Sequence, residues 1–154
     1  AKIYQGTAHF LYAPMYINSD IVRKELLKES VIRRVIEIIR RSDYVVTGIA
    51  DVSTERKKNT WAGYLTEEKM QDLVKNGAVG YLCGYFLDKN GKKLSDPIND
   101  KIIGISFEEL KKVPHVIAVA GGIDKTQAIL AALKGKLINC LITDSRIAEK
   151  LLDM

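Results

Sequence analysis

The sequence predicts an α/β domain with a mostly parallel sheet and helices on both faces. Short apolar segments typical of buried strands alternate with segments whose apolar residues recur at helical spacing. Repeated strand-then-helix units of this kind favour a parallel sheet that is covered by helices. The 154 residues, of which 47% are hydrophobic, are enough for one domain with its own core.

Five segments have the pattern of strands. They are residues 2–7, 44–49, 78–87, 116–120 and 138–142. The segment 116–120 is the most uniformly apolar, which is typical of a buried strand. The residues from Asp88 to Gly91, which follow the third segment, are typical of a hairpin-like turn.

Two helices are expected between the first two strands. Ser19 is the expected N-cap of one and Ser30 of the other, because a serine hydroxyl accepts a hydrogen bond from a free backbone amide. Both helices have apolar residues spaced to lie on one face. These residues are Ile21, Val22 and Leu26 in the first helix and Ile32, Val35, Ile36 and Ile39 in the second.

Four further helices are expected, each with a start or end signal in the sequence. They are a helix from Thr66 to near Asn76-Gly77, a short helix that the capping pair Ser106 and Glu109 starts and Pro114 ends, a helix at 124–134 with Gly135 as its C-cap, and a helix at 144–152.

Composition argues against several classes of function. The net charge is +5, but the basic residues are spread along the chain, and the densest cluster, at 55–58, is typical of a solvated loop. No helix-turn-helix or basic helix is recognisable, so DNA binding by this chain alone is not predicted. No apolar run approaches the roughly 20 residues of a membrane helix, and the first residues do not resemble a signal peptide.

The cysteines and histidines predict neither a disulfide nor a metal site. Cys83 and Cys140 lie in apolar strand-like segments without CxxC spacing, so we expect two buried free thiols and a cytoplasmic location. His9 and His115 are far apart in the sequence, which argues against a zinc site.

The carboxyl ends of the strands are where ligands bind in folds of this class. After the segment 116–120, Gly121 and Gly122 open a helix whose first turn contains Lys125. Glycines let the backbone approach a ligand, and free amides at a helix N-terminus attract an anion. A lysine there opposes the helix dipole at a cost of roughly 0.3–1 kcal/mol, which a bound phosphate would relieve. The alternative is a tight turn whose exposed lysine is compensated by Asp124.

Two other strand ends offer candidate ligand contacts. Asp51, which follows Gly48, can accept hydrogen bonds from sugar hydroxyls or cap its own backbone. Tyr81 contacts either a ligand or the core, and Trp61 either covers a ligand or anchors its loop. Neither a P-loop nor a Gly-x-Gly-x-x-Gly segment is found at these ends, which argues against a nucleotide site.

Eight stretches, taken together and in order, carry a resemblance to a known family. They are residues 12–17 (Tyr-Ala-Pro-Met-Tyr-Ile), 46–49 (Val-Thr-Gly-Ile), 65–68 (Leu-Thr-Glu-Glu), 77–80 (Gly-Ala-Val-Gly), 98–105, 116–125, 128–133 and 141–144. Over nearly its whole length, the chain resembles the effector domain of the SorC/DeoR-type sugar-responsive bacterial transcriptional regulators.

This resemblance implies a Rossmann-like fold, similar to that of glucosamine-6-phosphate and ribose-5-phosphate isomerases, that acts as a sensor. A phosphorylated sugar would bind at the strand ends, with Lys125 as a phosphate ligand, and change how a dimer or tetramer holds its operator. Residues 1–154 would be part of an effector domain. The first part of that domain and the N-terminal domain, through which alone DNA is bound, would lie outside the chain and leave apolar surface exposed.

The chain departs from the family pattern at two positions. Tyr81 stands where the family usually has an acidic residue, and Ala50 stands where glycine is common. The expected effector-binding residues are Gly48, Asp51, Trp61, Tyr81, Asp100, Gly121, Gly122 and Lys125, and no catalytic residue, metal or cofactor is expected.

Two other functions are compatible with the sequence. A sugar-phosphate isomerase on the same fold would need a base, for which Asp51 or Asp100 are the candidates. An oligomerisation module with a decayed pocket would account for Tyr81, Ala50 and the absent strands.

Overall fold

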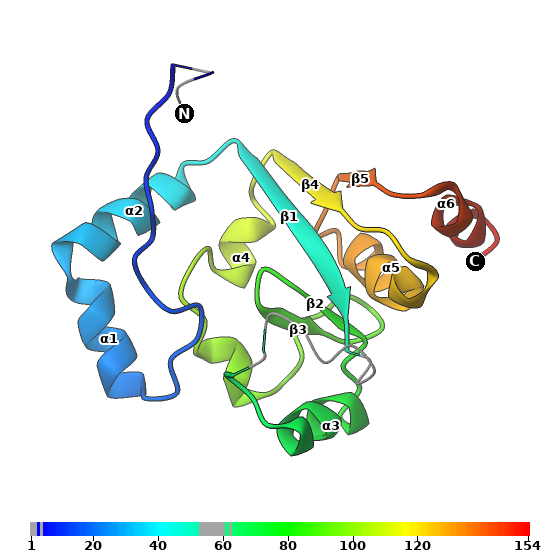
Figure 1. Ribbon diagram of the computed structural model, residues 1–154, viewed down its shortest axis with the longest axis horizontal. Coiled ribbons are helices and arrows are strands. Elements are labelled where there is room, and N and C mark those ends of the chain that lie inside the picture. Colours follow the sequence, from blue (N-terminus) through cyan, green and yellow to red (C-terminus); the bar gives the residue numbers. More distant parts are fainter. Residues whose placement is uncertain (1–2, 4, 53–60, 62) are drawn as a thin grey trace.

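The computed structural model describes residues 3, 5–52, 61 and 63–154, which form an α/β fold (Figure 1). The strands in these residues are β1 (Tyr44–Asp51), β2 (Gly80–Leu82), β3 (Tyr85–Leu87), β4 (His115–Val119) and β5 (Cys140–Ile142). The α-helices in the same residues are α1 (Asp20–Lys28), α2 (Ser30–Arg40), α3 (Glu67–Lys75), α4 (Phe107–Leu110), α5 (Thr126–Lys134) and α6 (Ser145–Leu152). No helix in this described part is both long and apolar enough to cross a membrane.

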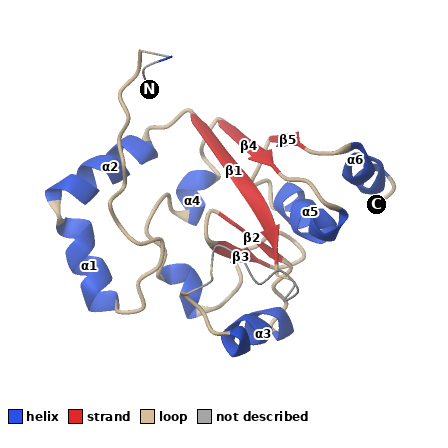
Figure 2. Cartoon of the chain, in the orientation of Figure 1, coloured by secondary structure: helices blue, strands red, loops and turns tan. Residues whose placement is uncertain are grey.

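The strands of the described residues form one sheet in the order β3-β2-β1-β4-β5 (Figure 2). β1 pairs in parallel with β4 from Tyr44↔His115 to Gly48↔Val119, and β4 pairs in parallel with β5. β2 runs antiparallel to both β1 and β3, so β3 points the same way as β1. The sheet is therefore mostly parallel, as predicted, with β2 as the reversed strand.

The segment expected to form one strand at 78–87 is instead a β-hairpin. β2 and β3 are joined by Cys83 and Gly84, whose φ angles are 50° and 85°. Two consecutive residues with positive φ are typical of the tight hairpin turn that matches strand twist. Cysteine is an unusual residue for that conformation. For this reason the apolar residues 78–87 were predicted to form a single strand. The second turn, at 88–91, forms as predicted, because Gly91 N–H donates to the Asp88 carbonyl at 2.9 Å.

Most helix boundaries follow the local capping signals. Thr66 accepts a hydrogen bond from Lys69 N–H at the start of α3, and Ser106 and Glu109 form the expected capping box of α4. The prediction for Ser30 was wrong, because α2 begins at Ser30 and Glu29 occupies the N-cap position. The strand expected at 2–7 is also wrong for the described residues of that segment, none of which is in a strand.

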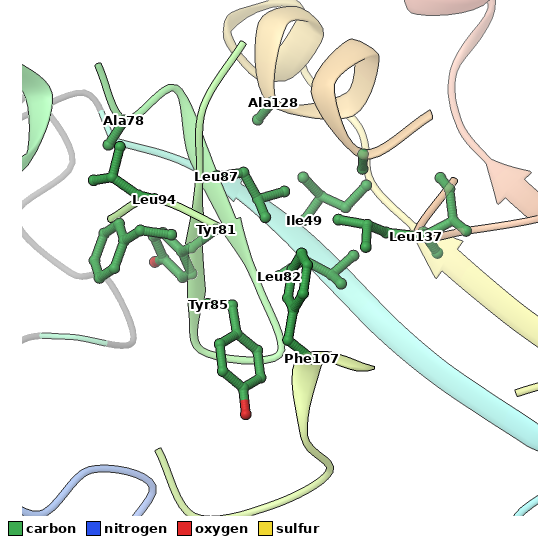
Figure 3. Packing of buried hydrophobic residues seen from close by; sticks show 14 of the residues in the cluster. Ile49, Ala78, Tyr81, Leu82, Tyr85, Leu87, Leu94, Phe107, Ala128 and Leu137 are labelled. Atoms are coloured by element: carbon green, nitrogen blue, oxygen red, sulfur yellow. The ribbon is translucent and has the colours of Figure 1, made fainter. Parts of the chain in front are cut away.

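One part of the core lies between α5 and the sheet, and other core residues come from α3, α4 and the segment 94–105 (Figure 3). α5 contacts β1, β2 and β3, and its approach is close because Gly80 faces Ala128 without an intervening side chain. An added Cβ at Gly80 would also lie 2.7 Å from the Ala50 carbonyl oxygen. The close contact holds α5 firmly on the hairpin, so the position of its N-terminus relative to β1 is fixed by packing.

One face of β1, β4 and β5 is uncovered. Tyr44, Val46, Val119 and Ile142 are 63%, 70%, 50% and 54% exposed, whereas Ala118, on the other face, is fully buried. Within the described residues, helix cover over these strands is therefore confined to one face. The expectation of helices on both faces does not hold here, and 116–120 is buried on one side only.

The exposed face also changes the interpretation of the second cysteine. Cys140 is exposed on β5 rather than buried, while Cys83 is half-buried, and both are free thiols. Burial raises the pKa of the Cys83 thiol, and a hydrogen bond to Thr47 opposes the change.

Candidate functional site

The loop between β4 and α5 is the centre of the candidate site. After Val119, Gly121 and Gly122 lead into a 3-10 turn, η3 (Ile123–Lys125), that continues directly into α5. Gly122 has a φ of 101°, a conformation that favours glycine. Lys125 is the N-cap residue of α5, and its N–H donates to the Gly122 carbonyl at 2.9 Å. The lysine therefore stands at the helix N-terminus, as the sequence predicted.

Asp144 holds this loop from the neighbouring strand end. Its Oδ2 accepts a hydrogen bond from Gly122 N–H at 2.9 Å, and its Oδ1 accepts one from Ile147 N–H at 3.1 Å as the N-cap of α6. These backbone hydrogen bonds, that from Gly122 foremost, lower the pKa of Asp144. The carboxylate therefore ties the glycine loop to α6.

Sequence reasoning missed this role of Asp144. The residue was expected only at the start of the last helix. A usable signal was present, because Asp144 follows the β5 strand end just as Asp51 ends β1. The same rule about strand ends would have placed it at the site.

Several hydrogen-bond donors in the loop remain available. Within the described residues, the N–H groups of Gly121 and Ile123 donate to no acceptor, and the Lys125 ammonium has neither an ion pair nor a hydrogen bond. Lys125 is half-buried, so its charge is less screened than that of a surface lysine. Free amides and an ammonium at the start of a nine-residue helix are an arrangement that binds anions.

The end of β1 lies beside this loop. η3 contacts β1, and Gly48 pairs with Val119 at the carboxyl end of the parallel strands. Asp51 is the last residue of β1 and is half-buried. The fold therefore brings Gly48, Asp51, the two loop glycines and Lys125 to one edge of the sheet.

Tyr81 and Trp61 are brought together in the aromatic core. Tyr81 is 5% exposed and Trp61 is 1% exposed, and both rings contact Phe86, with centroid distances of 5.5 Å and 5.1 Å. The Tyr81 and Trp61 ring centroids are 6.5 Å apart in an edge-on arrangement. Tyr81 is next to the end of β1, because it pairs with Ala50. Both rings are therefore buried in the core next to the sheet edge that carries Asp51.

Asp100 lies in another part of the molecule. It ends the 3-10 helix η2 (Pro97–Asp100) and is exposed, and its Oδ1 pairs with Lys93 Nζ at 2.8 Å. An open pocket that includes both residues lies on this segment between β3 and α4. Asp100 is therefore not among the residues that the fold gathers at the β4–α5 loop.

Comparison with known proteins identifies the family of this chain. The family described as "Putative sugar-binding domain" matches residues 1–153. The chain belongs to this sugar-binding domain family. The fold of the sugar-binding domain and its resemblance to SorC/DeoR-type regulators, both expected from the sequence, are confirmed.

Curated relatives of this sugar-binding domain are transcriptional regulators. It is 38% identical over 142 residues to the transcriptional regulator LsrR of Enterobacter sp. (strain 638), covering 91% of this chain and 44% of that protein. It is 32% identical over 153 residues to the deoxyribonucleoside regulator of Bacillus subtilis (strain 168), covering 99% and 48%. The chain thus spans about half the length of the curated relatives it matches.

Solved structures of regulators share the same fold. A sugar-binding domain of a transcriptional repressor from Vibrio fischeri has a TM-score of 0.86 and 27% identity, covering 99% of this chain and 60% of that one. The full-length sorbitol operon regulator SorC from Klebsiella pneumoniae has a TM-score of 0.83 and 27% identity, covering 90% and 45%.

The Asp144 contacts predict how the stability of the sugar-binding domain depends on pH. The pKa of Asp144 is lowered in the folded state, so its contribution to stability is present above the ordinary value of 3.8 and is lost as the pH falls through the folded-state pKa. We expect Asp144→Asn to reduce the free energy of unfolding at roughly pH 6, with the difference from wild type shrinking at roughly pH 3. Urea unfolding at both pH values measures it, and an equal difference at both would contradict the role of the carboxylate charge.

Proposed function

We propose that this sugar-binding domain senses a phosphorylated sugar without turning it over. The sugar binds at the edge formed by the ends of β1 and β4, in the cytoplasm. Binding modulates how a full-length dimeric or tetrameric regulator holds DNA, through a DNA-binding domain outside this chain. The observation that supports the proposal is the β4–α5 loop, in which the Lys125 ammonium and the amides of Gly121 and Ile123 have no partner among the described residues.

A phosphate group matches these donors better than a neutral sugar does. Its oxygens accept hydrogen bonds from amides and carry the charge that the Lys125 ammonium and the helix dipole attract. Asp144 already occupies the Gly122 amide at 2.9 Å and shapes the loop before any ligand arrives. Asp51 is the candidate hydrogen-bond partner of the sugar hydroxyls. Gly48, which pairs with Val119 of β4, has no side chain to block the approach of the sugar.

We further infer that residues 1–154 form part of a larger effector domain. The exposed apolar face of β1, β4 and β5 supports this inference, because parallel sheets are normally covered on both faces. The solved Vibrio fischeri sugar-binding domain, of which this chain covers 60%, contains additional polypeptide. That additional part is the expected cover for the face.

Replacing Lys125 tests the proposed site. At about 100 times its dissociation constant, a bound sugar phosphate should add roughly 2.7 kcal/mol to the free energy of unfolding, seen as a higher melting temperature. Loss of a charged hydrogen bond of about 1.5–3 kcal/mol predicts that Lys125→Ala weakens binding roughly 10- to 150-fold. The matched control is Lys24→Ala, which replaces an exposed lysine on α1 and should leave binding unchanged.

Two results would contradict the proposal. One is a stabilisation by phosphorylated sugars that survives Lys125→Ala. The other is an equal stabilisation by the same sugars without phosphate. The screen should be run on the full-length regulator as well as on the 154-residue chain, because the inferred remainder of the domain contributes to the pocket.

The isomerase alternative has less support from the geometry. Of its two candidate bases, Asp100, at the end of η2, is paired with Lys93, which leaves Asp51. Isomerisation of ribose 5-phosphate that Asp51→Asn abolishes would favour this alternative.

A further inference from the structure

Four lysines that are far apart in the sequence meet at one end of the sugar-binding domain. Lys89 and Lys92 lie in the turn after β3, and Lys134 and Lys136 lie at the C-terminal end of α5. All four are exposed. They are called the lysine end below.

A backbone contact between two glycines brings these lysines together. A Cβ added at Gly91 would lie 2.5 Å from the Gly135 amide nitrogen, and one added at Gly135 would lie 2.9 Å from the Gly91 Cα. Lys92 follows Gly91, and Lys134 precedes Gly135. With consecutive Cα atoms 3.8 Å apart, the Lys92 and Lys134 Cα atoms are at most about 12 Å apart.

The lysine end is not neutralised by neighbouring acids. The ion pairs of the described residues use Lys28, Arg40, Lys69, Lys75 and Lys93, and none of them involves the lysine end. The chain has no Asp or Glu between Asp124 and Asp144. Asp88 is the one acidic residue of the turn 88–92, and its Oδ1 accepts hydrogen bonds from the Asn90 and Lys92 N–H groups at 2.8 Å and 2.9 Å. The four lysines outnumber this carboxylate, so the lysine end keeps a net positive charge. At about 0.01 M salt the Debye length is about 30 Å, which exceeds the separation of the Lys92 and Lys134 Cα atoms, so the potentials of these charges add at low salt.

We propose that the lysine end binds the phosphate backbone of nucleic acid without sequence specificity. Lysines contact phosphates as point charges, and such contacts position a protein on a duplex without reading bases. Protein interfaces, in contrast, are depleted in lysine and enriched in aromatic residues and arginine, none of which is among these four side chains. The contact is separate from the effector site, because it lies at the opposite end of α5 from Lys125.

The salt dependence of DNA binding tests this proposal. The probe is a fluorescein-labelled duplex of random sequence, titrated with the 154-residue chain at several salt concentrations. Four phosphate contacts predict a slope of about −3.6 in log K against log salt, or a loss of about 150-fold in affinity between about 50 and 200 mM salt. The variant Lys134→Gln/Lys136→Gln should reduce the magnitude of the slope by about 1.8, so that the same salt change costs about 12-fold.

Matched variants distinguish binding at the lysine end from binding through the overall positive charge of the chain or through the effector site. Lys24→Gln/Arg33→Gln removes the same charge from exposed positions on α1 and α2, at the other end of the molecule in Figure 1, and should leave the slope unchanged. Lys125→Ala should also leave it unchanged. The proposal is overturned if the chain does not bind the duplex at low salt, if the control lowers the slope as much as the Lys134/Lys136 variant, or if Lys125→Ala alone lowers it. Tighter binding to polyglutamate than to the duplex would assign the surface to an acidic protein and would also overturn it.

Discussion

Replacing Gly91 with alanine is expected to lower the free energy of unfolding by about 4 kcal/mol. Two costs combine at this position. Gly91 has a φ of 73°, which costs roughly 1–2 kcal/mol for any residue with a Cβ. The added Cβ would also lie 2.5 Å from the Gly135 amide nitrogen, against backbone that has no flexible end to move aside. Overpacking of this kind costs roughly 1–3 kcal/mol.

Gly77→Ala separates these two costs. Gly77 also has a positive φ, of 94°, but a Cβ there meets nothing within 4 Å. We expect it to cost only about 1–2 kcal/mol. Urea unfolding of both variants gives the comparison, and equal losses would show that the turn and α5 accommodate the added Cβ at Gly91 without an overpacking cost. If Gly91→Ala does not fold, Gly135→Ala provides the second measurement of the same contact.

Replacing Asn99 with alanine is expected to cost about 3 kcal/mol. Asn99 is 2% exposed and its amide joins β3 to the following segment. Its Oδ1 accepts a hydrogen bond from Phe86 N–H at 2.9 Å, and its Nδ2 donates to the carbonyls of Phe86 and Leu94 at 3.1 Å and 2.8 Å. Alanine would leave the buried Phe86 N–H without its acceptor, which costs about 1–3 kcal/mol. The Phe86 and Leu94 carbonyls would each lose one hydrogen bond but would still accept from the Leu94 and Asp96 N–H groups.

Asn139 offers the matched control. Its side chain also bridges backbone groups, accepting from Val116 N–H and donating to the Pro114 carbonyl, but the residue is exposed. Water can replace the exposed bond to the Pro114 carbonyl, which leaves the part-buried Val116 N–H as the main loss, so Asn139→Ala should cost about 1 kcal/mol. Chemical unfolding of both variants at one pH measures the difference. A loss at Asn99 no larger than that at Asn139 would show that burial of the amide does not matter.

The features that the sequence predicted best are those set by neighbouring residues. The capping box of Ser106 and Glu109, the Thr66 cap and the turn at 88–91 each depend on contacts within a few residues. The glycine loop before Lys125 was also predicted, because a strand end followed by a helix start is a local pattern. What such a loop binds does not follow from that pattern alone.

The features that the sequence did not predict depend on contacts between distant segments. Cys83 adopts a positive φ in the turn by which β2 pairs back on β3, and of the two turn residues only Gly84 is typical of that conformation. The exposure of Cys140 follows from an uncovered sheet face rather than from the residues around it. Asp100 was grouped with the strand ends, yet η2 and its pair with Lys93 place it elsewhere.

The close approach of Gly80 to Ala128 and of Gly91 to Gly135 anchors α5 at two separate points along its length. A helix held in this way cannot slide along its axis relative to the hairpin without backbone collision. Any displacement started by a ligand at its first turn must therefore either stop in the glycine loop or move the helix and hairpin together as one unit. Whether a ligand moves only the glycine loop or also the helix and hairpin is thus determined by the two close contacts that glycines allow, one at Gly80 and one between Gly91 and Gly135.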